Sequence, residues 1–92
     1  SSDLMKFRSW VQGKLKYPQI AQENGISGKV TLTFVIERDG SLTNIQVMQS
    51  PDRSLADEAV RVLQSSPKWT PGKQRNSPVR VRYTLPVEFR IQ

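Results

Sequence analysis

The sequence predicts an α+β fold in which helices cover one face of a three-stranded sheet. Apolar residues recur at helical spacing in two long segments, and they alternate with polar residues in three others. The segments follow one another as helix, hairpin, helix and strand. A right-handed crossover from the second strand over the following helix brings the third strand beside the first. We therefore expect an antiparallel or mixed sheet with strand order 2-1-3 and its helices packed on one face.

The N-terminal segment has the periodicity of a short amphipathic helix that ends near Gly13. Pro18 disfavours the α region for Tyr17, so Tyr17 and Pro18 form a corner in the chain. A second, very short helix is expected over residues 19–24, with Gly25 as its C-cap. The apolar stripe of the first helix consists of Leu4, Phe7, Trp10, Val11 and Leu15.

A β-hairpin is expected after Gly28. Strict alternation places four apolar residues on one face of its first strand, namely Val30, Leu32, Phe34 and Ile36. The turn signal Arg38-Asp39-Gly40 follows, and residues 42–49 supply the second strand. In this second strand we expect Thr43, Ile45 and Val47 to share one face.

A second long helix is predicted in the middle of the chain. Ser54 and Asp57 form an imperfect capping box at its start, and Ser66-Pro67 ends it. Its apolar face consists of Leu55, Ala59, Val62 and Leu63. Residues 68–77 are rich in turn formers, and we expect them to form a loop. In that loop we expect Trp69 to pack against the core, as Trp10 does in the first helix.

The longest alternation in the chain follows Pro78 and predicts the last strand. A proline cannot donate to a ladder, and within sheets it is largely confined to edge strands and bulges. Pro86 therefore predicts, independently of the topology, that this strand lies at an edge. One face carries Val79, Val81, Tyr83, Leu85, Val87, Phe89 and Ile91, and the other carries Arg80, Arg82, Thr84, Pro86, Glu88 and Arg90.

Length and composition predict one domain without catalytic chemistry. A chain of 92 residues has room for a single core. We expect one domain over residues 1–92, with an N-terminal helix and lead-in over 1–16 and an αββαβ core over 17–91. The chain has no cysteine and no histidine, so thiolate ligands and the commonest general base are excluded. We expect no enzyme activity, no catalytic or metal-binding residues, no cofactor and no small-molecule substrate.

The net charge of +6 leaves nucleic acid, lipid headgroups and cell-wall polymers open as partners. Sheet-based RNA-binding proteins stack bases on aromatic side chains of their open face. Here Tyr83 and Phe89 belong to the apolar face of the last strand, and the outward positions hold arginine and threonine. We therefore expect no nucleic-acid partner. Binding through net charge alone would weaken steeply with added salt.

Two interpretations of the edge strand follow from its exposed N–H and C=O groups. Arginine and proline are residues with which proteins prevent unwanted pairing at an edge, and Arg80, Arg82, Pro86 and Arg90 fit that purpose. The alternative is β-augmentation, in which an extended peptide adds as a further strand and main-chain hydrogen bonds supply the affinity. A second copy of the chain is another partner that the same edge would accept.

An ordered set of residues resembles the TonB C-terminal domain family. The resemblance runs from about Leu15 to Phe89, and residues 68–89 are especially similar to TonB-type proteins of Bacteroidetes-like bacteria. The residues that carry it are Tyr17-Pro18, Ala21, Gly25-Ile26, Gly28, Val30, Phe34, Asp39-Gly40, Val47, Ser50, Asp57, Ala59, Pro67-Lys68-Trp69-Thr70-Pro71-Gly72, Pro78-Val79 and Leu85-Pro86.

The resemblance implies a periplasmic peptide-binding domain that serves transport. Family members use it to grip the TonB box of outer-membrane transporters, which pairs as an added strand with the domain's last strand. They are anchored in the inner membrane by an N-terminal helix and transmit proton-motive force from a motor complex, so we expect a longer parent chain to carry the anchor. Applied to this sequence, the resemblance implies that the peptide-binding residues are Val79, Arg80, Val81, Arg82, Tyr83, Thr84 and Leu85, with Tyr17 and Pro18 close by.

The resemblance also leaves a second function open. The same domain is appended to other envelope proteins, such as membrane sensor peptidases, where it is an accessory or self-association domain. Short fragments of family members form dimers, and a homodimer is therefore a further expected state of this chain.

Overall fold

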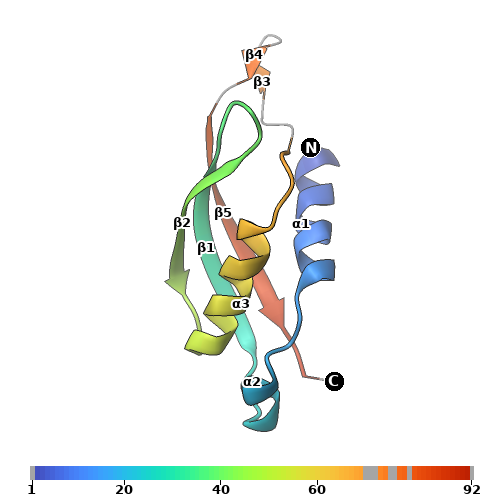
Figure 1. Ribbon diagram of the computed structural model, residues 1–92, viewed down its shortest axis with the longest axis vertical. Coiled ribbons are helices and arrows are strands. Elements are labelled where there is room, and N and C mark those ends of the chain that lie inside the picture. The colour runs from blue at the N-terminus through green and yellow to red at the C-terminus, as the bar shows by residue number, and fades with distance from the viewer. Residues whose placement is uncertain (1, 70–72, 75–76, 79, 92) are drawn as a thin grey trace.

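The computed structural model describes residues 2–69, 73–74, 77–78 and 80–91 and builds them around a three-stranded sheet. Strand β1 (Gly28–Ile36) lies in the centre, between β2 (Leu42–Gln49) and β5 (Val81–Phe89), as Figure 1 shows. Both outer strands are antiparallel to β1, so they run parallel to each other at opposite edges. The predicted strand order 2-1-3 is thereby confirmed.

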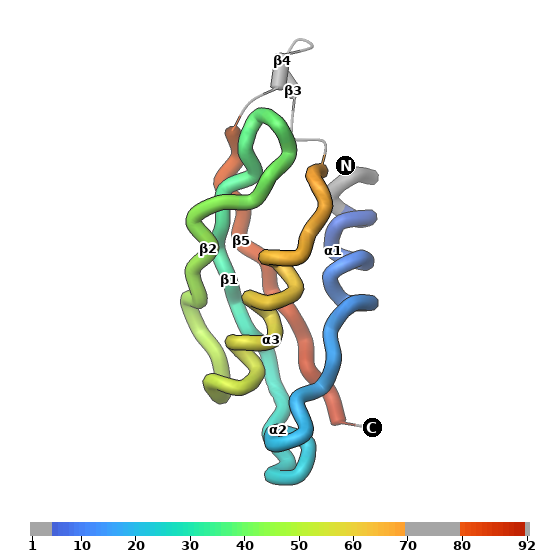
Figure 2. The backbone as a smooth tube through the Cα atoms, in the orientation of Figure 1, coloured from blue at the N-terminus to red at the C-terminus, as the bar shows by residue number. Residues whose placement is uncertain are grey.

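The two long helices cover one face of the sheet, as the sequence predicts (Figure 1). Helix α1 (Ser2–Lys14) lies beside β5, and α3 (Arg53–Gln64) packs over β1 and β2. The short helix α2 (Gln19–Glu23) closes one end of the molecule, opposite the turn between β1 and β2 (Figure 2). The domain is elongated, with extents of 49 × 21 × 17 Å.

The core lies between the sheet and the two helices. The four alternating residues of β1 and the predicted apolar face of α3 are all buried there, together with Phe7, Val11, Leu85, Val87 and Phe89. Trp10 and Trp69 are half-buried against this core, with ring centroids 6.0 Å apart, and Trp69 also meets Phe7 edge-on at 5.1 Å. Each large side chain that is fully buried contributes about 1.5–3 kcal/mol to stability, so this shared core holds both helices on the sheet.

A bulge in β2 makes one predicted pattern wrong. Thr43 pairs with Val35 and Gln46 pairs with Thr33, so three steps along β2 match two steps along β1. Asn44 has a φ of 54°, a conformation that asparagine adopts more readily than most residues. The extra residue reverses the alternation. Thr43 therefore lies on the open face, whereas Ile45 packs against the core.

The start of α3 also differs from the predicted capping box. Asp52 is the N-cap, and its Oδ2 accepts hydrogen bonds from the Ser54 N–H at 2.9 Å and the Ser54 hydroxyl at 2.6 Å. These bonds from Ser54 lower the pKa of Asp52 below its ordinary value. The Ser54–Asp57 box is wrong because aspartate two positions before Ser54 already satisfies the orphan N–H group.

The segment expected to be a loop contains a small hairpin. Strand β3 (Lys73–Gln74) pairs antiparallel with β4 (Ser77–Pro78) beyond the end of the sheet (Figure 1). Two-residue strands are too short to show an alternation, so hydrophobic periodicity could not predict them. Strand β5 begins at Val81, and Val79 lies outside the described residues. None of the described helices is long and apolar enough to cross a membrane.

Candidate functional site

The free edge of β5 is the candidate site. Within the part of the chain that the structure describes, β5 pairs with β1 alone. In an antiparallel pair, alternate residues direct both main-chain groups toward the neighbouring strand or away from it. Gln12 of α1 donates from Nε2 to the Glu88 carbonyl oxygen at 2.8 Å, so the main chain of Glu88 faces outward. By alternation, the main chains of Arg82, Thr84 and Pro86 also face outward, and Pro86 then costs no ladder hydrogen bond.

The predicted binding residues alternate along this strand. The side chain of Leu85 is buried, and those of Val81 and Tyr83 are half-buried. Arg82 and Thr84 are exposed and lie on the open face of the sheet, opposite Val35 and Thr33. A partner at this edge would therefore meet exposed polar side chains on one side and the rim of the core on the other.

Tyr17 lies at the other end of the strand from Val81. Its ring meets Phe89 edge-on, with centroids 5.6 Å apart, and its hydroxyl donates to the carbonyl oxygen of Ile26. The eight steps from Val81 to Phe89 span roughly 26 Å. The structure thus places half-buried Tyr17 beside Phe89, with Pro18 next to it in the chain, so the predicted site residues are divided between the two ends of β5.

Two cavities lie along α1 and β5. One has a volume of about 460 Å³ and is lined by Arg8, Ser9, Lys29 and residues 85–87, among others. The other has a volume of about 560 Å³ and is lined by Leu15, Tyr17, Phe89 and Arg90. Gln12 and Glu88 line both. The hydrogen bond between these two residues therefore stands where the cavities meet.

Sequence reasoning missed the contribution of α1 to this site. Arg8 and Gln12 are separated by one helical turn and flank the buried stripe that contains Val11. That spacing shows that both residues lie on one side of the helix. It does not show which strand the helix will cover, because the contact joins residues 76 positions apart.

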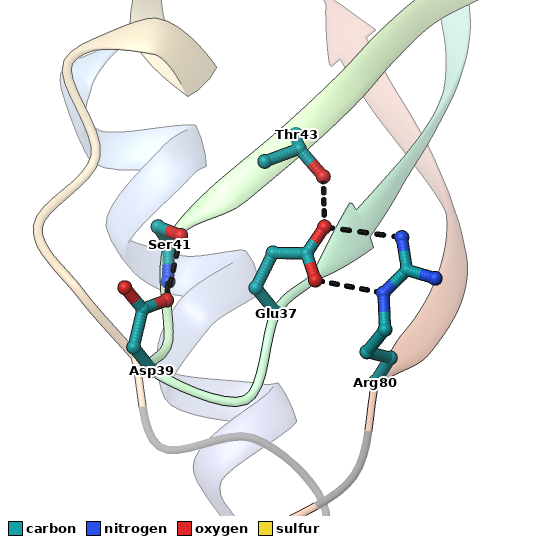
Figure 3. Close-up of polar contacts among 5 residues, drawn as sticks. All are labelled: Glu37, Asp39, Ser41, Thr43 and Arg80. Atoms are coloured by element: carbon teal, nitrogen blue, oxygen red, sulfur yellow. Dashed lines mark hydrogen bonds and ion pairs between the residues drawn. The ribbon is translucent and has the colours of Figure 1, made fainter.

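The guanidinium group of Arg80 is hydrogen-bonded within the domain. It donates from Nε to Glu37 Oε1 at 2.7 Å and from a second nitrogen to Oε2 at 3.2 Å, and the Thr43 hydroxyl donates to Oε2 at 2.5 Å (Figure 3). This cluster ties the start of β5 to the β1–β2 hairpin. Among the described residues, Arg82 and Arg90 form no ion pair, so they are better placed than Arg80 to attract an acidic partner.

Substitution of Glu37 by glutamine should reduce the acid sensitivity of the fold. The hydrogen bonds from Arg80 first, and from Thr43 second, hold the pKa of Glu37 below its ordinary value of 4.5. Because the pKa of Glu37 is lower in the folded state than in the unfolded state, its ionised form stabilises the fold at pH values above the unfolded-state pKa. This stabilisation is lost as the pH falls through the folded-state pKa. We expect the difference in urea midpoint between wild type and Glu37→Gln to be largest near neutral pH and to shrink below about pH 4. A difference that stayed constant between these pH values would contradict this role.

Two further carboxylates also have structural partners. Glu58 accepts two hydrogen bonds from Arg61 and one from the Lys16 N–H, and Asp39 accepts two from Ser41. The described residues contain no group of three potential metal ligands. The chemistry that this site offers is therefore main-chain pairing, contact with a half-buried apolar rim, and attraction by uncommitted arginines.

Comparison with known proteins identifies relatives of the whole fold. The family model described as Gram-negative bacterial TonB protein C-terminal matches residues 13–91. Protein TonB of Helicobacter pylori (strain J99) is 39% identical over 56 residues, which cover 61% of this chain and 20% of that protein. Protein TonB of Pseudomonas aeruginosa is 42% identical over 53 residues, covering 58% of this chain and 15% of that protein. The matched regions thus span a fifth or less of these curated relatives.

A solved structure shows the same architecture. A solution structure of the Helicobacter pylori TonB-CTD superposes with a TM-score of 0.82 at 28% identity, covering 99% of this chain and 82% of that one.

Proposed function

The chain belongs to the family of Gram-negative bacterial TonB protein C-terminal domains, and from this membership we propose that it binds the TonB box of outer-membrane transporters by strand addition to β5. As a TonB-type domain it acts in the periplasm. The partner segment would become a fourth strand beside β5 and would supply no chemistry beyond hydrogen bonds and side-chain contacts.

The observation that carries this proposal is the outward-facing main chain of Arg82 and Thr84. Each residue presents one N–H donor and one C=O acceptor at an edge that, in the described structure, has no neighbouring strand. Such paired groups are what an extended peptide needs to extend a sheet. The exposed side chain of Arg82 adds attraction for acidic residues of the peptide.

The proposal extends to energy transduction. In it, the parent chain is anchored in the inner membrane and receives proton-motive force through a motor complex, and this domain transmits a pull to the transporter. The domain itself acts as a grip and catalyses no reaction. A row of main-chain hydrogen bonds suits this task because the bonds are spread along the strand, so the pulling force is distributed over several of them.

An amide NMR titration tests the binding step. The isotope-labelled domain would be titrated with peptides from the periplasmic N-termini of outer-membrane transporters of the same organism. We expect saturable shifts that are largest at the amides of Arg82 and Thr84, because their N–H groups would gain new acceptors. A peptide of the same composition in scrambled order is the matched control.

Two outcomes would contradict strand addition. Shifts that spread over all basic residues and disappear in moderate salt would indicate binding through net charge. Shifts at β5 that depend on protein concentration without peptide would indicate self-association, which sedimentation at several concentrations would verify.

A further inference from the structure

The proposed docking edge is already occupied at one position. The exposed side chain of Gln12 extends from α1 and donates to the outward-facing Glu88 carbonyl oxygen at 2.8 Å. We propose that Gln12 is a register stop, a residue that ends the added strand before Glu88 and so selects where a peptide sits along β5. This inference rests on the proposed function, because it concerns the same edge.

The outward-facing groups along β5 are not equivalent. Arg82 and Thr84 each offer a donor and an acceptor. Pro86 offers only its carbonyl oxygen, because proline has no N–H. Glu88 keeps its N–H, but its carbonyl oxygen accepts the Gln12 amide. Complete donor and acceptor pairs are therefore confined to the half of β5 that begins at Val81, and the ladder weakens at two successive outward positions toward Phe89.

The path of an added strand leads to the same conclusion. Neighbouring strands lie about 4.8 Å apart, so a peptide paired with β5 would run through the space that the Gln12 side chain crosses. The two cavities of about 460 and 560 Å³ leave room on either side of Gln12, and Gln12 and Glu88 line both of them. A peptide that continued past Pro86 would have to displace the amide of Gln12 and take over the Glu88 carbonyl.

This arrangement sets the length of the paired segment. Pairing with Arg82, Thr84 and the carbonyl of Pro86 uses about five peptide residues, since one outward-facing residue occurs every two positions. Residues of the partner beyond that segment would gain no main-chain bond at Glu88. The register of the complex is then fixed by the domain, and a strand shifted by two residues toward Phe89 would meet Gln12.

Replacement of Gln12 by methionine tests this role, because it keeps the length of the side chain and removes the donor. The affinity of wild type and Gln12→Met would be measured by calorimetry for a five-residue peptide and for two versions lengthened by three residues, one at each end. We expect lengthening to leave wild-type affinity nearly unchanged. In Gln12→Met, one of the two longer peptides should bind roughly two- to tenfold more tightly than the short one, the worth of one added hydrogen bond.

A matched control is Gln22→Met, which makes the same change at an exposed glutamine of α2. It should behave as wild type with every peptide. An equal gain from lengthening in wild type and Gln12→Met would overturn the register stop and leave strand addition intact. No binding of any peptide to any of the three proteins would overturn strand addition, and the register stop with it.

Discussion

Thr84→Pro should reduce peptide affinity at least about tenfold while the domain stays folded. The main chain of Thr84 faces the free edge, so a proline there removes the N–H that a partner would use and leaves the ladder to β1 intact. The proline ring also disturbs close approach of a neighbouring strand. The change in the free energy of unfolding should stay within about 1 kcal/mol, because Thr84 is exposed and the position lies on an edge strand.

Two control substitutions separate main-chain from side-chain effects. Thr84→Ala keeps the N–H group and should bind peptide nearly as wild type does. Tyr83→Pro places the ring at a residue whose main chain faces β1, and it also removes the edge-on contact of Tyr83 with Phe34, whose ring centroid is 5.7 Å away. It should therefore destabilise the domain by about 3 kcal/mol or more. Urea unfolding and peptide titration of all three variants provide the measurement. Normal binding by Thr84→Pro would show that β5 is not the docking edge.

Gly40→Ala should destabilise the domain by about 2 kcal/mol or more. Gly40 has a φ of 90°, which residues with a side chain rarely adopt, and an added Cβ would fall on the main chain of Trp69. The same glycine accepts a hydrogen bond from the Trp69 N–H at 2.8 Å and donates one to the Glu37 carbonyl at 2.8 Å. The substitution would thus push apart the β1–β2 turn and the segment that holds Trp69 against Phe7.

Gly13→Ala is the matched control for this effect. Gly13 lies in α1, and an added Cβ there would meet no atom within 4 Å. Alanine is the better helix former, so this variant should be more stable than wild type by about 0.5–1 kcal/mol. Urea unfolding of both variants compares them directly. Shifts of the same sign and size would show that the close contact between Gly40 and Trp69 does not constrain the fold.

Much of the fold could be predicted from local patterns. The alternation of Val30, Leu32, Phe34 and Ile36 places these residues on one face of β1, and all four are buried. The helical spacing of Leu55, Ala59, Val62 and Leu63 likewise identified the buried face of α3. Pro86 indicated the edge strand because the constraint comes from a single missing N–H. In each case the feature is predicted by a pattern that repeats within the segment or by the chemistry of one residue, so no contact with a distant part of the chain has to be known.

Other features depend on contacts that no local pattern contains. The bulge at Asn44 places Thr43 on the opposite face from Ile45, although the alternation predicted that the two share a face, because an extra residue reverses the side-chain alternation at that point of the strand. The engagement of Arg80 by Glu37 joins residues 43 positions apart. Both arise from how β1 packs against its two neighbours.

The sequence was sufficient for the three helices, the three strands of the main sheet, their order and the identity of the edge strand, since periodicity and proline chemistry act over a few neighbouring residues. Only the tertiary structure placed α1 against β5 and thereby brought Gln12 to the carbonyl of Glu88. The physical reason is that an amphipathic helix shows which of its faces is buried, whereas the surface that buries it depends on the packing of the whole core.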